Sequence, residues 1–111
     1  MNPPSPKVHI VHLDPVRAEV HFLFEPPALP AGAEIRGRLV GPRCPGVSTI
    51  EVAYPLRPMA ERAGAVQVVI PEPSRWEPEC PFTYEAIFEF WIGETCSGKL
   101  SVPVGLRLGV S

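Results

Sequence analysis

The chain has 111 residues, of which 45% are hydrophobic and 20% charged, so its composition is that of one ordinary globular domain. Its net charge of −2, without any long basic run, argues against a nucleic-acid-binding surface. No apolar stretch approaches the ~18 residues of a membrane-spanning helix, and the start "MNPPSPKVHI" lacks the apolar core of a signal peptide, which together predict a cytoplasmic protein.

The hydrophobic pattern repeats every two residues along most of the chain, as in strands with one buried face. We expect residues 1–6 to be disordered and residues 7–111 to form a single domain. Its first strand is the uniformly apolar "KVHIVHL". The next run, "VRAEVHFLFE", has an apolar face of five side chains, namely Val16, Ala18, Val20, Phe22 and Phe24.

Two shorter alternating runs follow, at 33–41 ("AEIRGRLVG") and 48–55 ("STIEVAYP"). Their predicted inward side chains are Ile35, Leu39, Ile50, Val52 and Tyr54. The first run turns three charged side chains outward, namely Glu34, Arg36 and Arg38. Only 57–65, "RPMAERAGA", is predicted to hold a helical turn, which Gly64 would end.

Three more alternating runs, at 65–71, 83–92 and 99–108, complete the pattern. Their predicted inward side chains are Val66, Val68, Ile70, Tyr84, Ala86, Phe88, Phe90, Ile92, Leu100, Val102, Val104, Leu106 and Leu108. Seven short strands separated by Pro and Gly predict an all-β, antiparallel immunoglobulin-like β-sandwich. No cysteine pair brackets a tryptophan on the third strand, which favours the fibronectin type III kind.

The sequence shows no grouping of catalytic or metal-binding residues. His9 and His12 are an odd number of residues apart, so on a strand they would point to opposite faces. There is no G-x-S-x-G, C-x-x-C or glycine-rich phosphate loop. Cys80 lies beside an acid, which raises a thiol pKa and disfavours a reactive thiolate. We therefore predict no enzymatic activity, no metal or other cofactor, and free thiols at Cys44, Cys80 and Cys96.

Glu85 and Glu89 lie on one face of the 83–92 strand, and a carboxylate pair is also what a glycosidase uses. In this fold the third and sixth strands are neighbours, and Arg36 and Arg38 project from the same outer face. Cross-strand ion pairs are therefore the favoured interpretation.

Ile87 and Trp91 are predicted to face outward beside these charges. An exposed indole on a flat sheet can dock a protein or stack on a sugar, and a loop or the amino-terminal segment can also cover it. These three interpretations stay open. The predicted contact surface consists of Ile87, Trp91, Arg36, Arg38, Glu85 and Glu89.

The stretch "PEPSRWEPECPFTY", at 71–84, holds four prolines between two predicted strands. Pro71 and Pro73 would end the fifth strand. Trp76 is expected to fold over the open end of the sandwich. Tyr84 is expected to point inward, with its hydroxyl bonded to the backbone as in a tyrosine corner.

The longer stretch "IPEPSRWEPECPFTYEAIFEF" resembles the immunoglobulin-like β-sandwich domain of glycoside hydrolase family 2, the β-galactosidase and β-mannosidase group. The family connects two strands by W-x-P-x-x-P-x-x-Y and ends the domain with a glycine, an apolar residue and an arginine. The family usually has leucine where this chain has Arg75 and Thr83. The resemblance covers the carboxy-terminal half, and the matching residues are Trp76, Pro78, Pro81, Tyr84, Gly105, Leu106 and Arg107.

The resemblance implies a non-catalytic accessory domain, because the family's catalytic carboxylates lie in a following (β/α)8 barrel. On this basis we expect contact with a protein partner or adjacent domain, and a monomer or weak homodimer. The alternative is a small carbohydrate-binding module that uses an exposed tryptophan. The chain contains only two amide side chains of the kind that contact sugar hydroxyls, Asn2 and Gln67.

Overall fold

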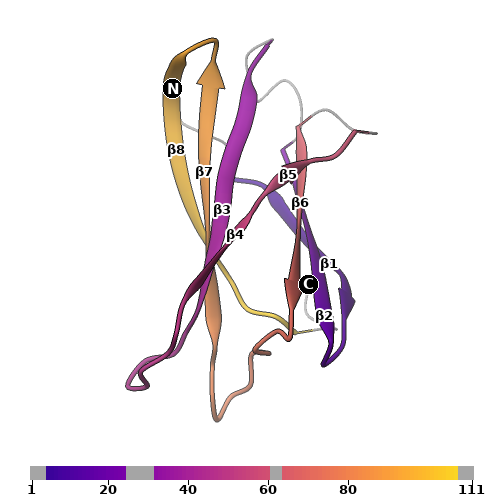
Figure 1. The fold of residues 1–111 in the computed structure, drawn as a ribbon, viewed down its shortest axis with the longest axis vertical. Coiled ribbons are helices and arrows are strands. Elements are labelled where there is room, and N and C mark those ends of the chain that lie inside the picture. The colour runs from indigo at the N-terminus through magenta and orange to yellow at the C-terminus, as the bar shows by residue number, and fades with distance from the viewer. Residues whose placement is uncertain (1–4, 25–31, 61–63, 108–111) are drawn as a thin grey trace.

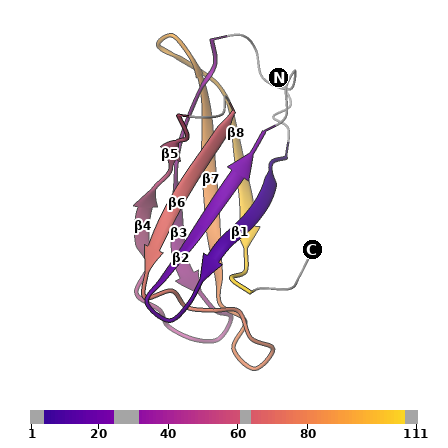
Figure 2. The same ribbon diagram turned by 90° about the vertical axis from the view of Figure 1, so that its right-hand side faces the viewer.

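The computed structural model describes residues 5–24, 32–60 and 64–107, which form two antiparallel four-stranded sheets packed face to face (Figures 1 and 2). One sheet has the order β1-β2-β6-β5, with bounds Lys7–Leu13, Arg17–Leu23, Ala65–Pro71 and Arg57–Pro58. The other has the order β4-β3-β7-β8, with bounds Val52–Pro55, Glu34–Arg43, Thr83–Ile92 and Thr95–Val104. The fold is therefore an all-β sandwich. The described part of the chain includes no apolar helix that could traverse a lipid bilayer.

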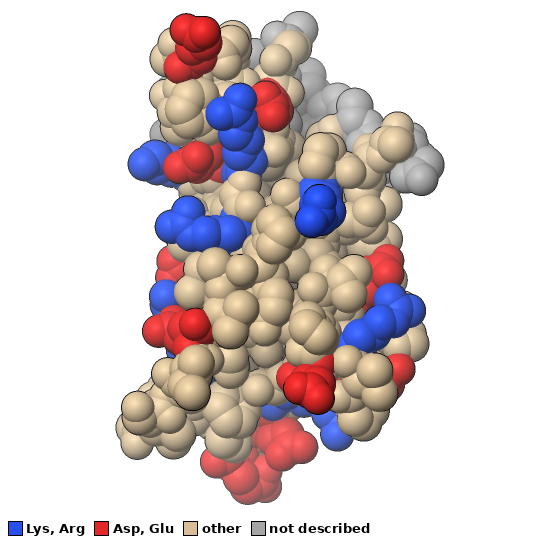
Figure 3. All heavy atoms as spheres, viewed as in Figure 1, with Lys and Arg blue, Asp and Glu red and all other residues tan. Residues whose placement is uncertain are grey.

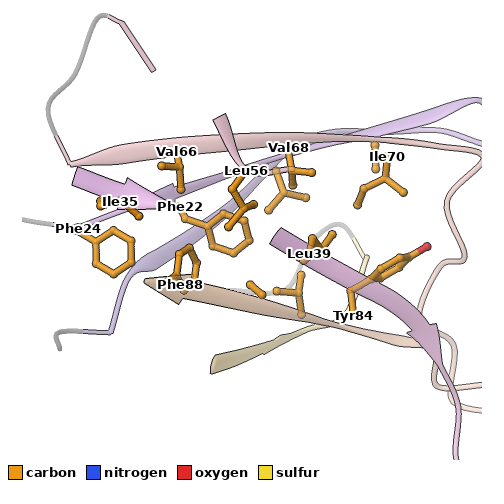
Figure 4. Close-up of a cluster of buried hydrophobic side chains, with 14 of the residues drawn as sticks. Phe22, Phe24, Ile35, Leu39, Leu56, Val66, Val68, Ile70, Tyr84 and Phe88 are labelled. Carbon is orange, nitrogen blue, oxygen red and sulfur yellow. The ribbon is translucent and has the colours of Figure 1, made fainter. Parts of the chain in front are cut away.

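The core lies between the sheets, where side chains of β2 and β6 meet those of β3 and β7 (Figure 4). Phe22 and Phe24 pack edge to face on Phe88, with ring centroids 5.2 and 5.1 Å apart. Phe24 also meets Phe90 at 5.4 Å. Each such pair contributes about 0.5–1.5 kcal/mol beyond the burial of its apolar area. These contacts fix how the two sheets lie on each other.

Sequence alternation predicted most of this core. The predicted inward side chains that are buried are Ala18, Val20, Phe22, Phe24, Ile35, Leu39, Val66, Val68, Ile70, Tyr84, Ala86, Phe88, Phe90, Val104 and Leu106. Three others are partly buried and pack against the core, namely Tyr54, Leu100 and Val102. The pattern is confirmed wherever a strand is covered by the opposite sheet.

Four predicted inward side chains are exposed instead, by 73% at Val16, 89% at Ile50, 45% at Val52 and 42% at Ile92. Val16 precedes β2 and Ile50 precedes β4, whereas Val52 and Ile92 are terminal residues of β4 and β7. Alternation buries a side chain only where another layer covers that face, so these predictions were wrong at strand ends. Leu108 lies outside the described residues.

The described residues form eight strands rather than the predicted seven, because a two-residue strand follows β4. β5 pairs with β6 at the place where a helical turn was predicted, and residues 61–63 of that segment lie outside the described residues. Arg57 precedes a proline, which disfavours the helical region for its backbone. Only Leu56 separates β4 from β5, so the chain changes sheets within one residue.

A β-bulge in β1 changes the faces of its histidines. The register shifts between Ile10 and His12, so that His9 lies opposite His21 while His12 lies opposite Glu19. His21 and Glu19 share the outer face of β2, since Ala18, Val20 and Phe22, which alternate with them along the strand, are core side chains. The inserted residue reverses the alternation, and His9 and His12 therefore lie on one face instead of opposite faces.

Candidate functional site

The predicted contact surface lies on the outer face of the sheet that contains β3 and β7. The register places Arg36 opposite Glu89, Arg38 opposite Ile87, and Trp91 opposite Glu34. The two arginines are exposed, whereas the outward side chains of β7 are half-buried. The expectation that these two strands are neighbours and share this face is confirmed.

Trp91 is held by its neighbours on this face. The guanidinium carbon of Arg36 lies 4.6 Å from the centre of the indole ring, and the indole Nε1 donates a hydrogen bond to Glu89 Oε1 at 3.2 Å. A guanidinium over an aromatic face contributes about 0.5–1 kcal/mol at an exposed site. The side chain that covers the Trp91 indole is therefore Arg36 of the adjacent strand β3.

The carboxylates of the surface form ion pairs, although with partners other than those predicted. Glu85 accepts a hydrogen bond from Arg43 at 2.8 Å, and Glu89 lies 3.9 Å from the Lys99 ammonium. Arg36 bonds along its own strand to Glu34 at 3.1 Å, and this bond lowers the pKa of the Glu34 carboxyl. The interpretation of these carboxylates as members of cross-strand ion pairs is confirmed, but their partners are Arg43 and Lys99 rather than Arg36 and Arg38. Arg36 reaches Glu34 instead, because residues two apart on one strand share a face.

Arg43 lies between two carboxylates at the edge of this surface. It bonds Glu51 as well as Glu85, and these bonds raise the pKa of the guanidinium above its ordinary value. Arg38, by contrast, is exposed and makes no ion pair with any described residue. The surface therefore holds two separate apolar side chains, Ile87 opposite Arg38 and Trp91 opposite Glu34, with Glu89 between them along β7.

The two carboxylates of this surface, Glu85 and Glu89, both have side-chain partners. Glu85 and Glu89 accept hydrogen bonds or ion pairs from neighbouring side chains, so both serve as acceptors on the sheet surface. Within residues 5–24, 32–60 and 64–107, no three His, Cys, Asp or Glu side chains are grouped so that they could hold a metal ion.

The second predicted group of residues meets at one end of the sandwich. The backbone N–H of Trp76 donates to Leu106 O at 3.0 Å, and the Arg107 guanidinium carbon lies 4.1 Å from the centre of the indole. A Cβ atom added to Gly105 would lie 3.1 Å from Trp76 Cδ1. A shallow cavity of about 210 Å³ opens here, lined by Leu13, Arg75, Trp76, Glu77, Leu106 and Arg107.

Tyr84 lies nearby and behaves as expected. Its side chain is buried, and its hydroxyl accepts a hydrogen bond from the backbone N–H of Ser74 at 3.0 Å. Pro71 is the last residue of β6, and Pro81 forms an isolated bridge with Trp76, whereas Pro78 is exposed. The proline-rich connection therefore packs the Trp76 indole onto the end of the sandwich, and its Ser74 N–H bonds the hydroxyl of Tyr84, a core residue of β7.

Sequence reasoning missed two features. Exposed apolar side chains gather around the β3–β4 connection, at Val47, Ile50 and Val52. The surface on the side of β4 and β5 is accordingly a broad uncharged area, with most charges at its margins (Figure 3). In addition, Cys44 and Cys80 lie close together, although all three cysteines are free as predicted. Both features depend on loop paths, which strand periodicity does not report.

No protein-family model, curated protein or solved structure matches this chain. The resemblance to the family 2 glycoside hydrolase domain therefore stays a prediction.

Proposed function

We propose that this chain is a non-catalytic interaction domain of the immunoglobulin-like kind, which binds a protein partner or an adjacent domain through the outer face of β3 and β7. The observation that carries the proposal is that the face on which Trp91 lies also holds Ile87 opposite Arg38, which makes no ion pair with any described residue. Tryptophan and arginine are the residues most enriched among those that dominate binding energy in protein interfaces.

The strand order supports the immunoglobulin-like part of the proposal. In that fold, one sheet contains the first, second, sixth and fifth strands when the extra strand of the opposite sheet is counted. The order β1-β2-β6-β5 facing β4-β3-β7-β8 agrees with this arrangement. The packing of Trp76 on Gly105 and under Arg107 supports the likeness to the family 2 accessory domain.

The proposal extends to a cytoplasmic location and to a monomer or weak homodimer. An indole already held by Arg36 and Glu89 loses little side-chain freedom on binding, which favours contact with a rigid partner. Sedimentation of the purified chain over a range of concentrations measures the self-association.

The test compares wild type with Trp91→Ala and with Val69→Ala, which removes an exposed side chain from a strand of the other sheet. Each purified chain is used to capture proteins from the source cell, and any captured protein is purified and titrated directly. We expect one partner to bind wild type and Val69→Ala equally. Trp91→Ala should bind it at least about 30-fold more weakly, the ~2 kcal/mol typical of a dominant interface residue.

Two outcomes contradict the proposal. Binding that survives Trp91→Ala but is lost in Val69→Ala places the contact on the opposite sheet. A partner whose titration is unchanged by Trp91→Ala, Ile87→Ala and Arg38→Ala removes this surface from the interaction altogether.

The carbohydrate-binding alternative is favoured by one observation, the cavity beside Trp76 with its two arginines. Against it, Arg107 already stacks on that indole, where a sugar ring would lie. Tryptophan fluorescence titrated with a glycan panel tests it. A response that is lost in Trp76→Phe and kept in Trp91→Phe would support this alternative, and a flat response would exclude the glycans tested.

A further inference from the structure

Two cysteines that are 36 positions apart in the sequence lie side by side at one end of the sandwich. Cys44 follows β3, and Cys80 lies in the connection from β6 to β7. Both connections project from the same end of the molecule (Figures 1 and 2). Their Sγ atoms are 4.0 Å apart, and both side chains are half-buried, so a small reagent can reach them.

Backbone hydrogen bonds hold each of these thiols in an ordered turn. The N–H of Val47 donates to Cys44 O at 3.2 Å, which closes the turn after β3. Cys80 donates to Glu77 O at 3.1 Å and accepts from Phe82 N at 2.9 Å. The proximity of the sulfurs therefore follows from two independently closed turns.

We propose that Cys44 and Cys80 form a reversible intrachain disulfide, with a low-molecular-weight disulfide as the oxidant. A disulfide bond is about 2 Å long, so the two sulfurs, which are 4.0 Å apart, must approach by about 2 Å to form it. The bond joins the β3–β4 connection, with its exposed Val47 and Ile50, to the β6–β7 connection.

The reaction is two successive exchanges. One cysteine thiolate attacks the small disulfide, which forms a mixed disulfide and releases one small thiol. The second cysteine thiolate then attacks the protein sulfur of that mixed disulfide and releases the second small thiol. Two cysteines are oxidised, one small disulfide is reduced to two thiols, and the two cysteine protons are found on those thiols.

The environment of Cys80 sets the pH dependence of this exchange. Burial raises the pKa of the Cys80 thiol, and so do its contact with Cys44 and the charge of Glu77. In the sequence, the acid beside Cys80 is Glu79, whereas the carboxylate whose charge raises the Cys80 pKa in the structure is Glu77. Oxidation should therefore be slow near neutral pH and accelerate as the pH rises, because the thiolate is the attacking species.

The experiment incubates the full chain with increasing ratios of oxidised to reduced glutathione and then counts thiols and measures the intact mass. We expect two of the three thiols to disappear together, with a mass loss of two hydrogens and no glutathione adduct. Cys96→Ser is the matched control, because Cys96 lies in β8 with its Sγ bonded to Gly98 O, and it should lose the same two hydrogens.

Cys44→Ser and Cys80→Ser should each lose this reaction and accept at most a glutathione adduct. The oxidised wild type should melt about 5–15 °C above its reduced form, because closing a loop of this length restricts the unfolded chain. If the disulfide stabilises the folded state, the folded state must favour the disulfide by the same free energy. Denatured wild type should therefore require a higher ratio of oxidised to reduced glutathione than folded wild type to form the bond.

Three results would overturn the proposal. These are stable glutathione adducts on both Cys44 and Cys80, a peptide map in which Cys96 is the linked residue, and retention of all three thiols at every ratio. Equal oxidant requirements in the folded and denatured states would also contradict it, because folding would then contribute nothing to the pairing.

Discussion

Two glycines have different roles at the scale of single residues. A Cβ atom at Gly37 would overlap the backbone oxygen of Ile87 and lie 3.1 Å from Leu56 Cδ1. A Cβ atom at Gly105 would instead touch the Trp76 ring, which is a side chain and can shift. The absence of a side chain is therefore required for strand pairing at Gly37 but only for surface packing at Gly105.

We predict that Gly37→Ala lowers the free energy of unfolding by about 3 kcal/mol or more, because β3 and β7 must separate to admit the methyl group. Gly105→Ala should cost about 1 kcal/mol, since only the indole must move. Urea denaturation of both variants beside wild type measures the difference. Equal losses would mean that the β3–β7 contact is looser than described.

Side-chain partners were the least predictable feature at this scale. Arg36 and Glu89 were correctly placed on one face and lie directly opposite each other, yet Arg36 bonds Glu34. A long charged side chain on an exposed face has several acceptors within reach, and small differences in solvation decide among them. Tyr84 was predictable because a buried hydroxyl must find a partner.

The turn between β1 and β2 depends on one carboxylate, which gives an element-scale prediction. Asp14 accepts hydrogen bonds from the backbone N–H groups of Arg17 and Val16, both at 2.8 Å, and bonds His12 at 2.6 Å. These bonds, with that from Arg17 the largest cause, lower the pKa of the Asp14 carboxyl to about 2.

A carboxyl whose pKa is lowered by folding adds stability above its unfolded pKa, and this contribution is lost as the pH falls through the folded pKa. We therefore expect the Asp14 contribution to be complete above about pH 5 and to be lost progressively as the pH falls to about 1. Urea midpoints across this window should fall less steeply in Asp14→Asn, which keeps an acceptor for the turn but cannot titrate. Parallel slopes in the two proteins would contradict this role.

Elements differed in how far the sequence predicted them. β2, β6 and β7 alternate regularly and lie in the middle of the sandwich, so local pattern and tertiary burial agree. β5 is two residues long and exists only through its pairing with β6. The bulge in β1 likewise has no signal in "KVHIVHL", because every residue of this run is compatible with either register.

At the scale of the whole molecule, each sheet has two inner and two edge strands. β2, β6, β3 and β7 are paired on both sides, whereas β1, β5, β4 and β8 are each paired on one. The largest fully buried side chains, such as Phe22, Phe88 and Tyr84, lie mainly on the inner strands. Global stability should therefore reside in the inner strands.

Amide hydrogen exchange tests this distribution. We expect the slowest exchange, governed by global unfolding, in β2, β6, β3 and β7, and faster exchange through local opening in β1, β4 and β5. If the amides of β4 exchange as slowly as those of β3, this edge strand opens only when the whole domain unfolds, and the expected difference between edge and inner strands is wrong. The two-sheet architecture was predictable from strand number and spacing, but this hierarchy required the strand order.

The one-residue passage at Leu56 has a mechanical consequence. β4 and β5 lie at the same long edge of the two sheets, while β1 and β8 occupy the other (Figure 2). Leu56 is buried, and its backbone N–H donates to Gly37 O at 3.1 Å, so this passage is anchored in the core. The β4–β5 edge therefore joins the two sheets through one anchored residue. We expect a force that pulls the sheets apart to separate them first at the opposite edge, beside β1 and β8.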